Sequence, residues 1–230
     1  MEDHNDTIEI EGYPHVRYYK TTYPETELLN RSEDYFNFLN QRRSARSFSN
    51  KTIPLQVIKN CIKAASTAPS GAHKQPWTFC IVRDANIKKQ IKEAAEKEEL
   101  ESYENRMSQE WLEDLKPIGT DWKKDFLEIA PYLIVIFKKS YNLDSNGKKS
   151  NNYYVNESVG LAAGFLLTAI HHAGLVALTH TPSPMNFLTK ILHRPENERP
   201  YLLIPVGYPA EKMYVPKLKR KEAEEIIQLY

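Results

Sequence analysis

Residues 153–173 constrain the fold more than any other part of the chain, because they form a predicted helix that is apolar on almost every side. Small residues occupy its middle, where Gly160 and Gly164 lie one helical turn apart. Such a helix must be buried in a core or in a subunit interface, and its two glycines let another backbone approach closely. Gly174 is placed to end the helix.

The composition is that of a globular protein, and its 230 residues predict one domain, residues 1–230, with a full core. With 41% hydrophobic residues, 27% charged residues and a net charge of +1, the chain lacks the basic excess of a general nucleic-acid binder.

Cys61 and Cys80 fit neither a metal-binding spacing nor a disulfide framework, which favours a reducing, cytoplasmic environment. The polar first six residues do not resemble a signal peptide, and the longest apolar run, 159–170, is shorter than the about 20 residues that span a bilayer, so no membrane association is expected.

The remaining pattern predicts four strands interleaved with helices, which indicates an α+β or α/β architecture. Residues 1–30 show little periodicity and are interpreted as an extended N-terminal arm that wraps the surface or a partner. Ser32 is a predicted N-cap for a helix that carries Tyr35, Phe36 and Leu39. Further helices are predicted at 54–65 and 185–193, and strands at 77–82, 132–137, 175–178 and 202–206.

A turn rich in small residues separates the helix at 54–65 from the strand at 77–82. Pro69 and Pro76 fix its ends, and residues 70–72, Ser-Gly-Ala, have almost no side-chain bulk. Such a turn leaves backbone N–H groups free to approach a flat or anionic ligand. The alternative is an ordinary helix-to-strand loop.

A dense group of donors lies at Arg42, Arg43, Ser44 and Arg46. Guanidinium groups match phosphate oxygens in a bidentate manner, and the serine hydroxyl adds a further donor. By itself the group could also be a surface patch or a kinase site. Arg220, in the basic C-terminal tail, could contribute from a distance.

Residues 86–128 are dense in Glu and Lys and contain only scattered apolar anchors. They predict two or three amphipathic helices with a break at 116–119. Charge runs usually form a solvated flank. The alternative is a mobile lid, since few apolar anchors mean low local stability.

Several familiar motifs are missing. The sequence contains no G-x-G-x-x-G and no P-loop, which excludes the common dinucleotide and NTP signatures. Ser70 is not surrounded by G-x-S-x-G, so it is no nucleophile elbow. His171 and His172 lack the spacing and the carboxylates of a zinc site, and we predict no metal centre.

Four motifs taken together resemble one known family. They are Arg-Arg-Ser-x-Arg at 42–46, Ala-Pro-Ser-Gly-Ala-His-x-x-Pro-Trp at 68–77, Thr-x-Thr-Pro at 179–182, and Pro-Val-Gly-Tyr-Pro at 205–209 followed by a late Lys-Arg-Lys. This combination resembles the nitroreductase superfamily, and more closely its iodotyrosine deiodinases, over about residues 35–225. The resemblance implies an α+β nitroreductase-like fold with a central mixed sheet flanked by helices. It also implies an intertwined homodimer with FMN at the subunit interface.

The resemblance further implies which residues hold FMN. The arginines and Ser44 would hold the phosphate and the polar edge of the flavin, residues 69–71 would come from the partner subunit, and Thr181 would be the catalytic residue beside flavin N5. The implied cofactor-binding residues are Arg42, Arg43, Ser44, Ala45, Arg46, Pro69, Ser70, Gly71, Thr179, His180, Thr181 and Arg220.

The implied substrate is a halogenated tyrosine. In the resembled family a glutamate, a tyrosine and a lysine on a lid, here about residues 95–125, hold the amino-acid end; Glu99, Tyr103 and Lys124 match them. A carboxylate suits the substrate ammonium, whereas a lysine and a phenol suit its carboxylate. The Ala72 backbone N–H would face the phenol oxygen.

The expected activity is therefore FMN-dependent reductive dehalogenation of 3-iodotyrosine and 3,5-diiodotyrosine to tyrosine and halide. NAD(P)H is the expected ultimate reductant, and a separate flavin reductase could deliver its electrons. The alternatives are a general NAD(P)H nitroreductase or quinone reductase, and a flavin- or halotyrosine-binding protein without turnover.

The sequence departs from the resembled family at two places. Animal members carry an N-terminal membrane anchor that this sequence lacks, so it is expected to be a soluble bacterial-type form or a truncated one. Animal members also tend to have three threonines where this chain has Thr179-His180-Thr181, so His180 either alters the flavin or faces away from it.

Overall fold

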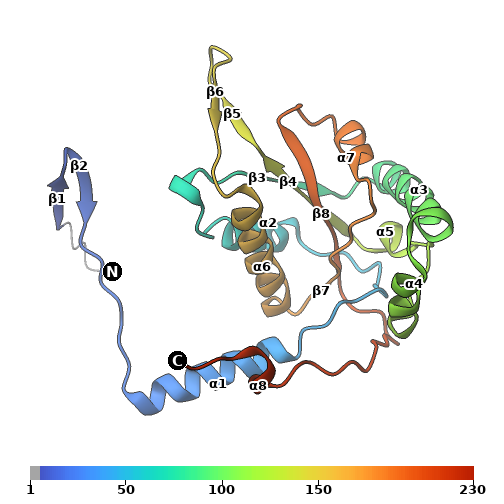
Figure 1. The fold of residues 1–230 in the computed structure, drawn as a ribbon, viewed down its shortest axis with the longest axis horizontal. Helices are drawn as coiled ribbons and strands as arrows, with labels where there is room; N and C mark the ends of the chain where they lie inside the picture. Colours follow the sequence, from blue (N-terminus) through green and yellow to red (C-terminus); the bar gives the residue numbers. More distant parts are fainter. Residues whose placement is uncertain (1–5) are drawn as a thin grey trace. The chain divides into compact units, whose positions relative to one another are not determined.

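The computed structural model describes residues 6–230 and divides the chain into two units, residues 1–41 and 42–230 (Figure 1). In the first unit, strands β1 (Thr7–Ile10) and β2 (Tyr13–Val16) form an antiparallel hairpin, and helix α1 (Glu25–Asn40) follows. The first five residues of the predicted arm lie outside the described residues.

The expected N-cap at Ser32 is wrong. Helix α1 begins at Glu25, directly after Pro24, and two acidic residues in its first turn suit the positive end of the helix dipole. Ser32 lies inside the helix, where its hydroxyl donates to the Leu29 carbonyl at 2.7 Å. This back-bonding satisfies the serine without ending the helix.

The second unit is built on a four-stranded sheet with strand order β3-β4-β8-β7. Its strands are β3 (Trp77–Val82), β4 (Tyr132–Lys139), β7 (Val176–Ala177) and β8 (Glu198–Gly207), close to the four predicted ones. The three ladders are antiparallel, and a single parallel bridge, Ser44 to Ala177, makes the sheet mixed at its β7 edge.

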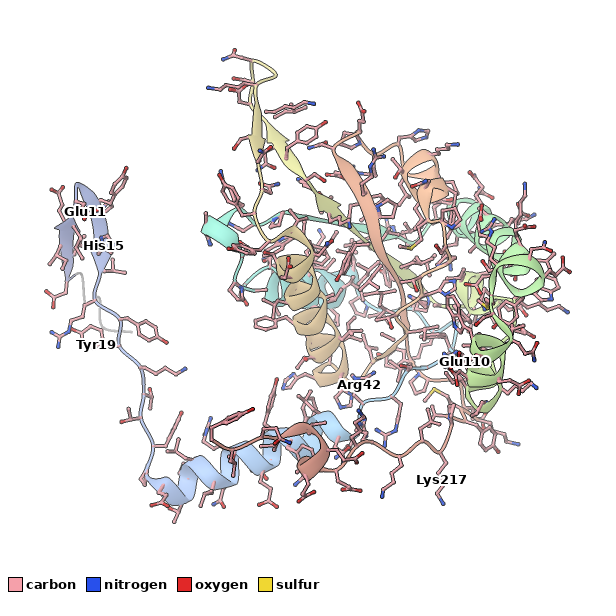
Figure 2. All side chains as sticks on the ribbon, viewed as in Figure 1. Glu11, His15, Tyr19, Arg42, Glu110 and Lys217 are labelled. Atoms are coloured by element: carbon pink, nitrogen blue, oxygen red, sulfur yellow. The ribbon has the colours of Figure 1, made fainter. Side chains whose placement is uncertain are left out.

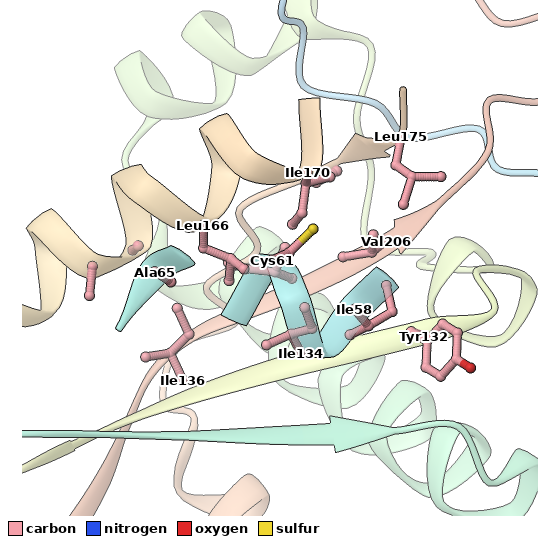
Figure 3. Close-up of a cluster of buried hydrophobic side chains, with 14 of the residues drawn as sticks. Ile58, Cys61, Ala65, Tyr132, Ile134, Ile136, Leu166, Ile170, Leu175 and Val206 are labelled. Carbon is pink, nitrogen blue, oxygen red and sulfur yellow. The ribbon is translucent and has the colours of Figure 1, made fainter. Parts of the chain in front are cut away.

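Both faces of this sheet are covered, which explains the continuous apolar run of β4. Ile134 and Ile136 point to the face covered by helices α2 (Leu55–Ala65) and α6 (Val155–His172), where Figure 3 shows them among Cys61, Leu166 and Ile170. Alternate residues of β4 point to the other face, covered by α3 (Ala85–Glu101), α5 (Phe126–Ile129) and α7 (Asn186–Ile191). Burial on two faces places β4 at the centre of the unit.

Helix α6 is buried within this chain on one side only. It starts at Val155 after Tyr154, whose φ is 47°, and ends before Gly174, whose φ of +74° suits a glycine. Leu166 and Ile170 are in the core, whereas Leu161 and Phe165 on another side are 48% and 43% exposed. The side of α6 that faces the sheet is thus buried, as predicted. A subunit interface that would cover its exposed side stays a prediction.

The charged region folds as expected from its pattern. Helix α3 runs into a π-turn (Ser102–Arg106), helix α4 (Gln109–Leu115) follows, and the predicted break is a 3₁₀ turn (Lys116–Ile118) closed by Gly119 with φ 65°. A hairpin of β5 (Tyr141–Leu143) and β6 (Lys149–Asn151) extends from the end of β4, and the short helix α8 (Ala223–Ile226) lies in the tail (Figure 1). No helix in residues 6–230 combines the length and the apolar character needed to cross a bilayer.

A buried carboxylate links three strands at one end of the sheet. Glu198 of β8 accepts hydrogen bonds from the Thr78 hydroxyl of β3 at 2.6 Å and from Arg194 Nε at 2.7 Å, and Lys139 Nζ of β4 lies 3.6 Å away. Burial alone would raise the pKa of Glu198, but the bonds from Arg194 and Thr78 bring the pKa below its ordinary value. The carboxylate is therefore ionised and fully paired at neutral pH.

Replacing Glu198 by alanine should lower the free energy of unfolding by about 3 kcal/mol, because it leaves the two cations and the hydroxyl that face it without their acceptor. Urea unfolding at pH 7 measures the change. Glu196→Ala, an exposed glutamate two residues earlier, is the matched control and should change the free energy by less than about 0.5 kcal/mol. Equal effects of the two substitutions would contradict the role given to Glu198.

Candidate active site

A cavity of about 200 Å³ lies between the charged helical region and the segment that follows β7. It brings together seven residues that the sequence had singled out: Arg46, Glu99, Tyr103, Lys124, Thr179, His180 and Thr181. These residues come from four separate parts of the second unit, so only the fold makes them neighbours. Met107, Trp111, Leu115, Phe126 and Leu178 supply apolar wall.

Local structure positions Glu99, Tyr103 and Lys124 of the charged region. Glu99 is in the last turn of α3, and Tyr103 follows one turn later in the π-turn, which the bond from Met107 N to the Ser102 carbonyl (2.8 Å) closes. The Tyr103 hydroxyl donates to the Thr120 carbonyl at 3.2 Å. The backbone of Lys124 is fixed in place, because its N–H donates to Glu96 Oε1 at 2.7 Å.

Lys124 and Glu99 form a buried ion pair in the wall of the cavity. Lys124 Nζ lies 3.3 Å from Glu99 Oε2, and the two side chains are only 4% and 12% exposed. The ammonium also donates to the Asp121 carbonyl and lies 5.7 Å from the centre of the Tyr103 ring. The arrangement supplies an anion, a cation and a phenol within one small cavity.

A second lysine ties the start of the charged region to the core. Lys88, on α3, is buried, and its Nζ donates to the carbonyls of Glu128 and Ala130 at 2.7 and 2.9 Å. These carbonyls lie at the end of the four-residue helix α5, which is too short to be stable alone. Lys88 therefore holds α3, which carries Glu99, to α5, which begins two residues after Lys124.

His180 lies on the opposite side of the backbone from its two threonine neighbours. Its N–H and carbonyl pair with Leu203 at 2.9 and 3.0 Å, so the segment is extended; Thr179 and Thr181 are exposed, and His180 is 7% exposed. The ring packs edge-on against Phe126, with centroids 5.7 Å apart. Thr179 and Thr181 thus share one face, as side chains two apart in a strand do.

Burial, with the Lys124 and Arg46 cations nearby, lowers the pKa of His180 to about 3. The imidazole is therefore neutral at physiological pH. Among residues 6–230, no hydrogen-bond partner is found for His180 Nε2. The sequence left open whether this histidine faces away from the flavin. In the structure its side chain is buried on the side of the backbone opposite to the two threonine side chains.

The arginine segment is anchored at the β7 edge of the sheet. Ala45 is fully buried, and its N–H donates to the Ala177 carbonyl at 3.1 Å beside the Ser44 bridge. Arg42 lies at the start of this segment (Figure 2), and its carbonyl accepts from Arg220 Nη2 at 3.3 Å. Arg220 thus lies next to Arg42, and its predicted contribution to a cofactor site stays a prediction.

Like charges crowd around Arg42. Burial, Arg220 and Arg43 together lower the pKa of Arg42, and burial lowers the pKa of Arg46. In the described part of the chain no carboxylate pairs with Arg42 or Arg46. Several guanidinium groups gathered in one region fit a dianionic phosphate, so the residues present suit FMN.

The Pro69–Ala72 turn lies elsewhere in the unit. Gly71 N–H donates to Ser158 Oγ of α6 at 3.4 Å, and a Cβ on Gly71 would come within 2.9 Å of the Tyr153 carbonyl. Ala72 has a left-handed φ of 48°. Backbone strain of this kind is concentrated at functional sites. In this chain the turn does not line the cavity, and its predicted contribution from a partner subunit stays a prediction.

Sequence reasoning did not assign a role to the apolar wall. Met107, Trp111, Leu115 and Phe126 were visible only as scattered apolar anchors of a charged region. Their common wall depends on the π-turn, which redirects the chain between α3 and α4. The residues described by the structure contain no group of His, Cys, Asp and Glu side chains arranged to hold a metal ion.

His180 should make stability depend on pH. Its pKa is about 3 in the folded chain and near 6.5 when unfolded, so protons bind the unfolded chain preferentially between these values. Stability from this residue is present above pH 6.5 and falls by about 2 kcal/mol between pH 7 and pH 5. Chemical unfolding at several pH values should show that His180→Phe removes this part of the pH dependence.

The matched control for this pH experiment is His172→Gln, which removes an exposed histidine at the end of α6. It should keep the wild-type slope of unfolding free energy against pH. An unchanged slope in His180→Phe would mean that the buried imidazole does not resist protonation in the folded chain.

The chain is similar to known proteins over most of its length. The model of the Nitroreductase family matches residues 39–208. The chain is 62% identical to an iodotyrosine deiodinase of Haliscomenobacter hydrossis over 94% of its own length and 97% of that protein. It is 45% identical to an iodotyrosine deiodinase of Danio rerio, over 99% of this chain and 78% of that one.

A solved structure is also similar. The crystal structure of oxidized iodotyrosine deiodinase bound to FMN and 3-iodo-L-tyrosine superposes with a TM-score of 0.71 and 34% identity, covering 85% of this chain and 98% of that chain. The fold described above is thus a nitroreductase-like α+β fold.

Proposed function

The chain belongs to the nitroreductase family, among its iodotyrosine deiodinases, and from this premise we propose that it removes iodide reductively from 3-iodotyrosine and 3,5-diiodotyrosine with FMN as its cofactor. The relatives that support the proposal are named for this activity, and one of them binds FMN and 3-iodo-L-tyrosine.

One observation carries the proposal: the cavity that Glu99, Tyr103 and Lys124 line is also lined by Thr181 and Arg46. The first three can hold an ammonium and a carboxylate, and Arg46 belongs to the arginine segment that suits a phosphate. An amino acid and a flavin can therefore meet here. A general nitroreductase would have no need for the charged trio.

FMN would be held by Arg42, Arg43, Ser44, Arg46 and Arg220, and when bound it would supply the two electrons that replace iodide by hydrogen. Thr181 offers a hydroxyl on the exposed side of a segment fixed by the His180–Leu203 pairs. The Ala72 N–H, contributed by a partner subunit, would stabilise the phenolate. Trp111 on α4 and Met107, just before that helix, would exclude water from the site.

A homodimer follows from the same proposal. The turn that carries Ala72 lies away from the cavity in one chain, so a second copy must supply it, and the exposed side of α6 offers apolar surface for such a contact. We further propose that the protein is cytoplasmic and that NAD(P)H is the ultimate electron source, delivered directly or by a separate flavin reductase.

The purified protein should bind one FMN per subunit and release iodide from 3-iodotyrosine when reduced. Absorbance measures bound flavin, and an iodide electrode measures turnover. Arg42→Ala should lower FMN occupancy, because a charge-assisted contact contributes about 1.5–3 kcal/mol, whereas Arg199→Ala on β8 should not. If the protein binds FMN but releases no iodide, it is a binding protein without turnover. If it reduces only nitro compounds, it is a general reductase.

Thr181→Ala should keep FMN and the fold but slow deiodination by at least about tenfold, near 1.4 kcal/mol of barrier. Reduction of a nitroaromatic should persist, because the substitution removes a hydroxyl and no binding charge. Thr181→Ser retains the hydroxyl and should recover most of the deiodination. Parallel loss of both activities in Thr181→Ala would mean general damage to the site.

A further inference from the structure

A second and larger cavity lies at the end of the sheet where β4 begins, opposite the end that Glu198 links. It has a volume of about 920 Å³, and we call it the end groove. Tyr132 of β4 lines it, together with Arg83 directly after β3 and Ala210 and Glu211 beyond β8. The end groove shares no lining residue with the active-site cavity, so it is a separate site.

The buried residues that line the end groove form an apolar floor. Phe48, Ile53 and Tyr132 are 5%, 4% and 6% exposed, and Ile129 and Pro131 extend the apolar surface. The Tyr132 hydroxyl donates to the Ile53 carbonyl at 3.0 Å, which holds the loop before α2 against the start of β4. A floor of this kind gives a flat ring a surface to pack on.

The side of the end groove next to β3 carries two cations. Lys88 is 9% exposed, and two of the three N–H groups of its ammonium donate to the carbonyls of Glu128 and Ala130. Within residues 6–230 the third N–H has no acceptor. Burial lowers the pKa of Lys88, and the charge of Glu128 opposes this only in part. An anion in the groove would thus give this ammonium the partner that it lacks.

Arg83 is the second cation. Its side chain is exposed at the rim, and the described part of the chain offers it neither an ion pair nor a side-chain hydrogen bond. The hydroxyls of Ser49 and Thr52 line the same groove. Ammonium, guanidinium and hydroxyl donors together suit a phosphate group, whose oxygens accept several charge-assisted bonds at once.

The side of the end groove next to β8 carries an acceptor instead. The strand order β3-β4-β8 puts the segment of Glu211 two strands away from that of Arg83, and two strand spacings are about 10 Å. Glu211 has no ion-pair or hydrogen-bond partner among residues 6–230. Glu128, the other carboxylate of the groove, is already paired with Lys92 at 3.2 Å. Glu211 therefore favours a ligand that ends in an amino or hydroxyl donor.

We propose that the end groove binds a phosphate monoester of a flat ring system, with the phosphate at Lys88 and Arg83, the ring on the apolar floor and an amino or hydroxyl donor at Glu211. A nucleoside monophosphate has this chemistry. The site is independent of the deiodination proposed above, and no step of that reaction uses it.

Isothermal titration calorimetry of the FMN-loaded protein tests the proposal with adenosine monophosphate as the probe. Loading with FMN keeps the probe away from the arginine segment. Inorganic phosphate and adenosine each carry only part of the proposed ligand, so adenosine monophosphate should bind at least about tenfold more tightly than either. Phenyl phosphate has the phosphate and a ring but no donor for Glu211, and it should bind less tightly than the nucleotide.

Substitutions on the two sides of the groove should have different effects. Arg83→Gln should raise the dissociation constant of adenosine monophosphate at least about tenfold, because it removes a charge-assisted contact. Glu211→Gln should weaken adenosine monophosphate but leave phenyl phosphate unchanged. The controls Arg199→Gln and Glu196→Gln replace exposed residues outside the groove and should bind both probes like the wild type.

Failure of adenosine monophosphate to bind with a dissociation constant below about 1 mM would overturn the proposal. So would equal binding by the wild type and Arg83→Gln, or a loss of binding in Trp111→Ala, which would place the probe in the active-site cavity. Tighter binding of L-tyrosine than of the nucleotide, with the same dependence on Arg83, would overturn the assignment to phosphate. Because none of these measurements involves iodide release, the end groove and the proposed deiodination can fail separately.

Discussion

The burial of β4 on both faces is the constraint on which the second unit depends. Its side chains alternate between the core under α2 and α6 and the core under α3, α5 and α7. Because β4 pairs along its length with β8, and Leu203 of β8 holds His180, the position of the two threonines is set from the centre of the sheet. The positions of the site residues are therefore fixed by packing against β4 and not by the loops that carry these residues.

The charged wall of the cavity has a different basis. Glu99, Tyr103 and Lys124 lie in a region with few buried anchors, and there the order comes from polar contacts: the ion pair, the bond from Lys124 N to Glu96, and the two bonds of Lys88. Polar networks of this kind specify a unique arrangement but lose much of their value when one member is removed. A rigid sheet on one side and a network-dependent wall on the other suit a site that must change to admit its ligand.

The sequence was informative where periodicity and burial agree. The four strands and helix α6 could be predicted because apolar residues recur with the period of the element that buries them. The predicted N-cap at Ser32 was wrong, because serine is a good cap in isolation, whereas the earlier start of α1 at Glu25, after Pro24, depends on context. The proximity of Glu99 to Lys124 could be guessed only through resemblance, because 25 residues and a π-turn separate them. The surroundings of His180 could not be predicted, since they depend on Phe126, Lys124 and Arg46, which come from distant segments.

The Lys88 anchor has a consequence for how such a protein can diversify. It holds the end of α5 to α3, so the segment between Ser102 and Thr120, which contains the short helix α4, is a connection whose two ends are fixed to the core. Closing a longer loop between fixed ends costs little, about 0.6 kcal/mol for each doubling of its length. Insertions and deletions there can reshape the apolar wall around Trp111 without disturbing the strands or the arginines. Changes in the length of this segment can thus give the protein new substrate preferences. They fall at positions where the stability of the rest of the molecule imposes almost no restriction.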